Sequence, residues 1–309
     1  MSAYGDCGAI MAGVARDLRS SRYVEEGIAA ARLLRHNTHE TKLPLTLFSN
    51  TCFRQLVLQR GASALWDEHR ELRLQAELRP LVTAQSSCCV KEACSANKIS
   101  PLVYAYALKL SALLSSRYDR TLFIDLDILV LSPSLPWTLF DILSVVDVAM
   151  PGPVPGRHSN LGSATATTLG VPVLCSCLMA YRTSPQVLSW MLDAARRLLT
   201  RESPALRRQG DQEYLWLAWV HAHTKLRVLG LPDEYYCPHA AFATLQLERS
   251  ATPLSPRNLI ANVTQNGYTR PCLSVHGHGK GSLIDTALGP FTPARRTLRG
   301  EESVRNVSW

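Results

Sequence analysis

Two acidic residues separated by one position give the strongest chemical signal in this sequence. Asp125 and Asp127 follow the apolar run Leu122-Phe123-Ile124 within the stretch FIDLDILVL. In an open α/β sheet, ligands bind beyond the carboxyl ends of the strands, where two such carboxylates are free to converge on one cation. Oxygen ligands of this kind suit Mn²⁺ or Mg²⁺, and leaving them buried without a partner would be costly. The spacing therefore predicts a divalent metal site, although two acids at a strand end also occur as a structural feature alone.

A second polar group stands late in the chain, in the glycine-rich segment SVHGHGKG. It contains His276, His278 and Lys280, and its glycines let backbone N–H groups approach a bound anion. A short apolar strand is expected over Leu273-Ser274-Val275, with His276 as the first residue beyond it. An isolated histidine is usually structural, but two histidines flanked by glycines and a lysine favour an anion or metal site.

The elements that must position these residues have the pattern of an α/β protein. Ala9 to Val14 is predicted as a buried strand, an amphipathic helix follows it, and Leu45 to Phe48 is predicted as a second strand. Such a strand–helix–strand unit implies neighbouring parallel strands joined by a right-handed crossover. Ser100 and Pro101 begin a further helix, and the unbroken apolar run before Asp125 suits a central strand. We expect a mixed, mostly parallel sheet flanked by helices.

The second half of the chain continues this pattern. After Met150, the segment PGPVPGRHSNLGSATATTLG is typical of a long loop over a site. A strand is expected over Val171 to Tyr181, an amphipathic helix from Ser184-Pro185, and another helix from Asp211. The predicted organisation is one domain over residues 1–284 and a basic tail over residues 285–309 that wraps the surface or is poorly ordered.

The composition limits the function classes. The chain has 309 residues, 46% of them hydrophobic, with no long uncharged apolar run and no secretion signal at its start. As written it is expected to be cytoplasmic; if the start is incomplete, a lost anchor would place it in the Golgi lumen, at a membrane. The formal charge of +8 comes from scattered Arg-rich segments typical of a solvated surface, and it also helps to attract a phosphate-bearing substrate or an anionic membrane surface. No nucleic-acid-binding motif accompanies that charge, so nucleic acid is not an expected partner.

The nine cysteines are an odd number and lack the paired C-x-x-C spacing of a zinc site. They are interpreted mainly as buried or free thiols. Cys88, Cys89 and Cys94 could form a disulfide in an oxidising compartment, and sequons at Asn262 and Asn306 would fit the same compartment.

The region around Asp125 resembles the D-x-D region of GT-A nucleotide-sugar transferases of the glycogenin-like, family 8 type. Matching residues are Lys109, the turn from Ser116 to Leu122, and the two aspartates, with LFDIL and DVA following downstream. The resemblance extends from about Ala9 to Lys280. It implies a Rossmann-like GT-A fold and the metal-dependent transfer of a hexose or pentose from a nucleotide diphosphate, expected to be UDP, to an unidentified acceptor.

The resemblance also implies roles for single residues. Asp211 and Gln212 would reach the hydroxyls of the donor sugar, although an ordinary capped helix start explains them equally well. His276 would be the third metal ligand, and His278 would not. The phosphate and nucleoside contacts implied are Lys109, Lys280, Tyr23 and Asn50, of which Tyr23 and Asn50 also fit ordinary turn residues.

Two departures from the family pattern leave alternatives open. Members commonly carry Asn-x-Gly where this chain has Cys175-Ser176-Cys177, and the late histidine motif is compressed. A catalytically silent protein that binds nucleotide sugars is therefore a rival reading. A phosphohydrolase of the haloacid-dehalogenase type also uses D-x-D, but Leu129 stands where it needs Thr or Val, and its motif lies near the start of the chain. The resemblance implies retention of anomeric configuration, and no nucleophile is identifiable.

Overall fold

The computed structural model describes residues 6–15, 21–39, 41–82, 100–152, 174–200, 210–221, 226–232, 235–236, 245–247, 261–265 and 268–276. Within these ranges, only the backbone is described for residues 21–22, 245–247, 261–265, 268–272 and 275–276. His278, Lys280, the predicted loop after Gly152 and the predicted basic tail lie outside the described residues. The same holds for Cys88, Cys89 and Cys94.

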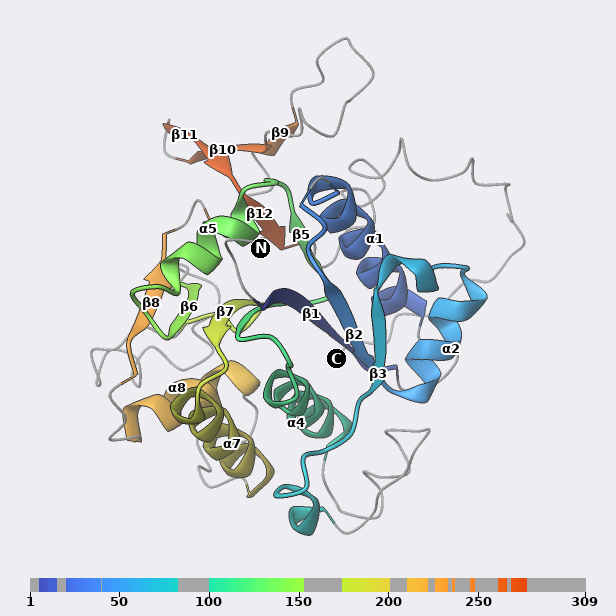
Figure 1. Ribbon diagram of the computed structural model, residues 1–309, viewed down its shortest axis with the longest axis vertical. Coiled ribbons are helices and arrows are strands. Elements are labelled where there is room, and N and C mark those ends of the chain that lie inside the picture. Colours follow the sequence, from blue (N-terminus) through green and yellow to red (C-terminus); the bar gives the residue numbers. More distant parts are fainter. Residues whose placement is uncertain are drawn as a thin grey trace.

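One sheet organises the described part of the chain. Its strands are β1 (Cys7–Gly13), β2 (Leu45–Ser49), β3 (Glu68–Glu71), β4 (Arg120–Ile124), β6 (Val148–Pro151), β7 (Leu178–Arg182) and β8 (Val228–Leu231). Their order is β3-β2-β1-β4-β7-β6-β8, as the reader can follow in Figure 1. All neighbours pair in parallel except β7, which runs antiparallel to both β4 and β6. The expectation of a mixed, mostly parallel sheet is confirmed.

Helices cover both faces of this sheet because successive strand residues point to opposite sides. Met11 and Leu122 pack into a core with α1, α2 and α5, whereas Ile10 and Phe123 pack into a second core with α4, α7 and α8. The helices are α1 (Ser21–Asn37), α2 (Thr51–Gln59), α4 (Pro101–Leu114), α5 (Leu135–Ile142), α7 (Pro185–Thr200) and α8 (Asp211–His221). Both faces of the central strand β4 are therefore buried, as its unbroken apolar run predicts.

The helix starts that lead to the site follow the predicted capping chemistry. Ser100 accepts a hydrogen bond from the backbone N–H of Val103 at 3.2 Å, and Pro101 is the first residue of α4. Ser184 accepts from the backbone N–H of Val187 at 3.3 Å at the start of α7. These caps satisfy N–H groups that have no partner within the helix.

Shorter elements complete the described structure. Two 3-10 helices, η1 (Ser63–Leu65) and η2 (Arg79–Leu81), flank β3 on the chain. A small antiparallel sheet has the order β11-β10-β9, with β9 (Leu245–Leu247), β10 (Ala261–Gln265) and β11 (Tyr268–Cys272). A further pair joins β5 (Ile128–Val130) to β12 (Ser274–His276) in antiparallel orientation.

Two strand predictions are wrong in their bounds. The strand expected over Val171 to Tyr181 begins only at Leu178, because residues 174–177 form a turn whose backbone hydrogen bonds differ from those of a strand in the sheet. In that turn the backbone N–H of Cys175 donates to the carbonyl of Pro151 at 3.1 Å. The late strand includes His276 as its last residue instead of ending before it.

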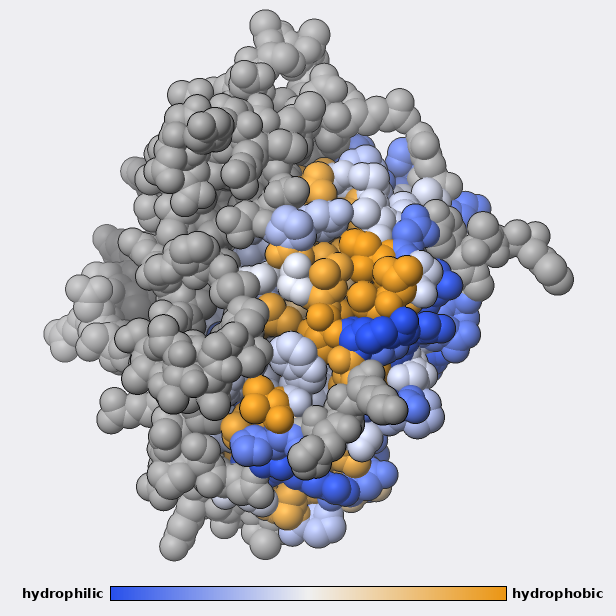
Figure 2. All heavy atoms as spheres, turned by 90° about the vertical axis from the view of Figure 1, so that its left-hand side faces the viewer, coloured by the Kyte–Doolittle hydropathy of each residue, from blue (hydrophilic) through white to orange (hydrophobic). Residues whose placement is uncertain are grey.

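The side of the molecule that carries α5, α8 and β8 presents apolar as well as polar residues to solvent, as Figure 2 shows. Large exposed apolar side chains on these elements include Val145, which follows α5, Val220 of α8 and Leu229 of β8. None of the described helices has the length and apolar character needed to cross a membrane.

Candidate functional site

The D-x-D turn is held in place from several directions. The backbone N–H of Asp125 donates to the carbonyl of Cys177 at 2.9 Å, and the N–H of Ile128 donates to the carbonyl of Asp125 at 3.1 Å. Leu126, between the two aspartates, packs against Gly27 of α1, where an added Cβ would lie only 2.9 Å from Leu126 Cδ2. Because Leu126 points into the core, the aspartates on either side of it are left at the end of β4.

Lys109 of α4 lies at the centre of a polar cluster that includes Asp125. Its Nζ atom is 2.8 Å from Oδ2 of Asp125 and 3.0 Å from Oδ2 of Asp211. It also donates to Oγ of Ser176 at 3.3 Å, and Ser176 donates to Oδ2 of Asp211 at 2.7 Å. Since an ammonium has three N–H donors, these acceptors use its full capacity. Lys109 therefore joins the end of β4, the turn before β7 and the start of α8.

The electrostatics of this cluster favour a bound cation. Burial opposes the charge on Lys109, but the carboxylates of Asp125 and Asp211 outweigh it and raise the pKa of the lysine, which stays protonated. At Asp125, burial raises the pKa to about 7, with further contributions from Asp127 and Asp211, even though Lys109 acts in the other direction. Additional positive charge beside Asp125 would lower this pKa and stabilise the ionised form.

The oxygen atoms of Asp125 and Asp127 are the donor type that Mn²⁺ and Mg²⁺ prefer, so the residues present fit such an ion. Among the described side chains there is no group of three His, Cys, Asp or Glu residues that could hold a metal. The backbone of His276 is paired with Ile128, the residue that follows Asp127. The structure thus brings His276 next to the D-x-D turn, while its side chain lies outside the described atoms.

Comparison with solved structures identifies the fold. The galactosyltransferase LgtC, in complex with donor and acceptor sugar analogues, is 12% identical with a TM-score of 0.53, over 94% of this chain and 98% of LgtC. Mouse xyloside xylosyltransferase 1 is 12% identical with a TM-score of 0.51, over 88% of this chain and 98% of its own. The chain adopts the GT-A fold. No family model matches it, and no curated protein sequence is significantly similar to it.

Within the GT-A fold, Asp211 and Gln212 occupy the first two positions of α8. Asp211 is buried and faces Lys109, so it belongs to the same cluster as Asp125. Gln212 donates from Nε2 to Oε1 of Glu213 at 3.2 Å, and Glu213 caps the helix by accepting from the N–H of Gly210 at 2.8 Å. The two residues of the predicted pair therefore differ: Asp211 supplies a buried carboxylate to the cluster, whereas the carboxamide of Gln212 bonds to Glu213 at the helix start.

The two predicted nucleoside contacts have different surroundings in this GT-A chain. Asn50 is buried; its Oδ1 accepts from the N–H groups of Phe53 and Ala15 at 3.1 and 3.0 Å, and its Nδ2 donates to the carbonyl of Ala15 at 2.7 Å. These bonds cap α2 and attach it to the end of β1. Tyr23, in the first turn of α1, is 48% exposed.

Three residues that sequence reasoning missed lie at or near the same polar cluster. Ser176 lies between Lys109 and Asp211. Tyr106 lies beside Gly210, where an added Cβ would be 3.2 Å from its ring, and burial, followed by the charge of Asp211, raises the pKa of Tyr106 to about 12. Burial, followed by the charges of Asp127 and Asp125, also raises the pKa of Tyr236. One signal was available: Tyr106 stands one helical turn before Lys109 on α4.

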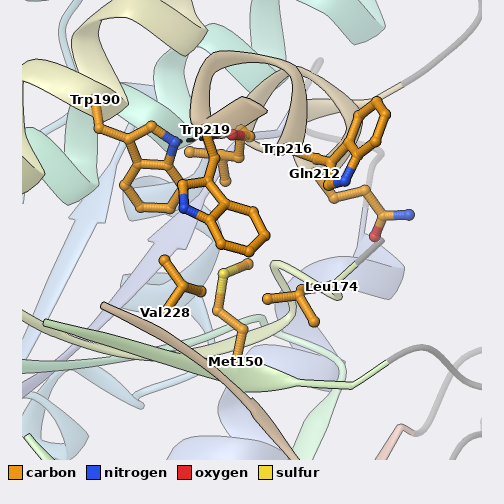
Figure 3. Close-up of a pocket in the computed structure, with 8 residues that line it drawn as sticks. Met150, Leu174, Trp190, Gln212, Trp216, Trp219 and Val228 are labelled. Carbon is orange, nitrogen blue, oxygen red and sulfur yellow. Dashed lines mark hydrogen bonds between the residues drawn. The ribbon is translucent and has the colours of Figure 1, made fainter. Parts of the chain in front are cut away.

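An apolar cavity lies along a different face of α8 (Figure 3). In this view Trp219 and Gln212 lie on opposite sides of the cavity, and Trp190 donates from Nε1 to the carbonyl of Leu215 at 2.8 Å. Apart from Gln212 and the indole N–H groups, the lining is apolar and suits packing, not phosphate binding. The lining residues are Met150, Leu174, Trp190, Gln212, Leu215, Trp216, Trp219 and Val228.

The interpretation of the cysteines as thiols needs one correction. Cys175 and Cys177 form a disulfide across a single intervening residue, with their Cα atoms 5.3 Å apart. A strand would also place these two side chains on the same side. The turn before β7 additionally brings the two Cα atoms closer together than they would be in a strand. Cys7 and Cys52 are buried thiols.

Proposed function

We propose that the protein is a metal-dependent glycosyltransferase that moves a sugar from a nucleotide diphosphate, UDP in the first instance, to an acceptor. The observation that carries this proposal is the cluster of Lys109, Asp125 and Asp211 at the carboxyl end of β4 in a GT-A fold. Supporting it, LgtC, which shares the fold, was crystallised with donor and acceptor sugar analogues. The GT-A fold leaves no support for a haloacid-dehalogenase mechanism.

Asp125 and Asp127 would hold Mn²⁺ or Mg²⁺, with His276 as the third protein ligand. When bound, the ion supplies positive charge that stabilises the diphosphate as a leaving group. Lys109 keeps Asp125 and Asp211 oriented, because its ammonium binds both carboxylates. Lys109 was expected to contact phosphate, but its three N–H groups are engaged, so a direct contact would require it to give up one of these bonds.

The remaining roles concern the organic parts of the donor. Asp211 and Gln212 would contact hydroxyls of the sugar, and Lys280 the phosphates. Tyr23 would contact the base or ribose from the exposed start of α1. Asn50 would act indirectly, since its carboxamide is engaged in tying β1 to α2.

A panel of nucleotide sugars tests the proposal. With Mn²⁺, the wild-type protein should hydrolyse or transfer from at least one donor, and chelation of the metal should stop the reaction. Asp127→Asn should abolish turnover and leave the fold intact, because it removes a charged ligand and keeps the side-chain size. Asp193→Asn is the matched control, since Asp193 pairs with Arg197 on α7, away from the cluster.

Two outcomes would contradict the proposal. Turnover that persists in the chelator or in Asp127→Asn would rule out the metal assignment. UDP binding without turnover of any donor would favour the silent binding protein that the Cys175-Ser176-Cys177 departure suggests.

A comparison of two histidine variants tests the third ligand. His276→Ala should raise the Mn²⁺ concentration required for half-maximal activity, because β12 pairs His276 with the residue after Asp127. His278→Ala should mainly weaken donor binding. If only the His278 variant requires more metal, the assignment to His276 is wrong.

A further inference from the structure

The turn from Cys175 to Cys177 bonds to every part of the polar cluster. Ser176, the residue inside the disulfide ring, is 2% exposed and bonds to Lys109 and Asp211 at 3.3 and 2.7 Å. The carbonyl of Cys177 accepts from the N–H of Asp125 at 2.9 Å. The conformation of this one short ring therefore sets the position of a hydroxyl and of a backbone acceptor in the proposed active site.

A ring closed by a disulfide across one residue restricts the backbone of that residue strongly. If the disulfide is reduced, Cys175 and Cys177 regain their side-chain rotations, and Ser176 gains backbone freedom. The hydrogen bond from Ser176 to Asp211 is made to a carboxylate, which places it among the stronger hydrogen bonds. Loosening it would remove one hydrogen-bond partner from Lys109 and one from Asp211, and would leave the two residues with only their direct ion pair.

We propose that Cys175 and Cys177 form a reversible thiol–disulfide site whose disulfide positions Ser176 between Lys109 and Asp211, so that oxidation favours substrate binding and reduction weakens it. This inference rests on the proposed function for its effect on substrate, but the disulfide and its effect on the turn do not depend on it. Cys175 and Cys177 are positioning residues, since they act through Ser176 and Asp125.

The reductant in this proposal is a dithiol. One thiolate of the dithiol attacks a sulfur of the Cys175–Cys177 bond and forms a mixed disulfide, and the released cysteine sulfur takes up a proton. The second thiol of the reductant then displaces the other cysteine and leaves as a cyclic disulfide. Two electrons and two protons pass in total to the protein, which ends with two thiols. The cyclic disulfide of the dithiol is the oxidant in the reverse exchange, which re-forms the Cys175–Cys177 bond and regenerates the dithiol.

Burial makes the exchange dependent on local opening. Cys175 and Cys177 are 9% and 4% exposed, and Sγ of Cys175 lies 4.0 Å from the hydroxyl oxygen of Tyr236. A reductant can reach the disulfide only when the turn opens, so a bound nucleotide that closes the site should slow the reduction.

The oxidation state is measured first. Protein purified without reductant is denatured, alkylated and digested, and the peptides are identified by mass spectrometry. The peptide containing Cys175 and Cys177 should carry no alkyl group and have the mass of an internal disulfide, whereas Cys7 and Cys52 should be alkylated. Alkylation of both Cys175 and Cys177, even after mild oxidation of the folded protein, would overturn the proposal.

A second measurement follows the turn without any substrate. Hydrogen exchange at the Asp125 amide should accelerate when the protein is reduced with dithiothreitol, because that N–H donates to Cys177. It should return to the slow rate on reoxidation. An exchange rate that is unchanged by reduction would show that the disulfide does not hold the turn.

The third measurement is UDP affinity in the presence of Mn²⁺. Reduction should weaken it roughly ten-fold, the order expected for one hydrogen bond to a charged group. The double variant Cys175→Ser, Cys177→Ser should have the weaker affinity with or without dithiothreitol, whereas Cys52→Ser should respond to dithiothreitol as wild type does. Ser176→Ala should remove the response and Ser176→Thr, which keeps the hydroxyl, should restore it.

The outcomes separate this inference from the proposed function. Failure of UDP to bind in either state would refute the proposed function, and the mapping and exchange measurements would then decide on the disulfide. Equal UDP affinity in the oxidised and reduced states, with the disulfide mapped, would overturn its positioning role.

Discussion

Two faces of α8 contrast in chemistry although they belong to one short helix. Asp211 faces Lys109 and joins the polar cluster at the end of β4. The apolar cavity is lined instead by residues of α8 that are three or four positions apart and so share one face of the helix: Gln212, Leu215, Trp216 and Trp219. The polar face holds charges around the proposed site, and the apolar face contributes packing against α7 and the sheet.

The contrast teaches where substitutions should act. In the polar cluster, stability depends on each charge keeping its partner, because a buried charge without one is costly. Around the cavity, stability depends on filled volume and on single hydrogen bonds such as that of Trp190. Substitutions at the polar face should alter both stability and ligand binding, whereas those at the apolar lining of the cavity, which excludes Gln212, should alter stability alone.

The largest effect on stability is expected for Lys109→Met. The variant leaves the buried carboxylate of Asp211 and the partly buried carboxylate of Asp125 without their cation, which should lower the free energy of unfolding by roughly 3–5 kcal/mol. Urea denaturation of both proteins measures the difference. UDP affinity should fall as well, and a variant as stable as wild type would show that the cluster is not held by this lysine.

A smaller effect is expected for Leu215→Ala at the cavity. Leu215 is buried, and truncating a buried leucine costs about 2–5 kcal/mol, towards the lower end here because a side chain that borders a cavity has fewer packing contacts to lose. UDP affinity of the folded variant should stay within about two-fold of wild type, as no charged group has moved. A loss of affinity as large as that of Lys109→Met would break the distinction between the two faces.

Trp190→Phe should have a modest effect. The substitution keeps an aromatic ring but removes the hydrogen bond to the carbonyl of Leu215, which should cost about 1–2 kcal/mol. Denaturation midpoints of the variant and the wild-type protein measure this loss of stability. No change in stability would indicate that water replaces the indole.

The smallest effect is expected for Asp147→Asn beside β8. Asp147 pairs with the exposed Arg227 at 3.0 Å, and this hydrogen bond holds the pKa of Asp147 below its usual range. A lowered pKa contributes stability above the unfolded-state pKa and loses it as the pH falls. The variant should therefore be less stable than wild type by under about 1 kcal/mol at pH 7, and the difference should begin to shrink at about pH 4 and disappear as the pH falls through the lowered pKa of Asp147. A larger cost at pH 7 would mean that this surface pair anchors β8.

Strands and helix starts could be predicted from the sequence where a local residue pattern determines them. The apolar run before Asp125 is a central strand because both of its faces are buried, and Ser100 and Ser184 cap the helices that they were expected to begin. The resemblance to GT-A transferases, carried by the D-x-D segment, also led to the correct fold.

The composition of the cluster was harder to predict, because it depends on contacts between distant segments. Lys109 and Asp211 come from different helices, and only the assembled sheet brings them together around Ser176. The turn at Cys175 was mistaken for a strand since its residues are apolar, and the bonds to Pro151 and Asp125 that bend it are tertiary. Asn50 likewise has the residue type of a ligand contact but serves as a helix cap.

Calorimetric titration of UDP tests the central claim most directly, since it requires neither the donor sugar nor the acceptor. Wild-type protein should bind UDP with Mn²⁺ and lose most of that affinity without it. Asp127→Asn should bind weakly in both conditions, whereas Trp219→Phe, at the cavity, should bind as wild type does. UDP binding that is indifferent to Mn²⁺ and to Asp127, or that is lost in Trp219→Phe, would contradict a metal-dependent nucleotide-sugar site at the end of β4.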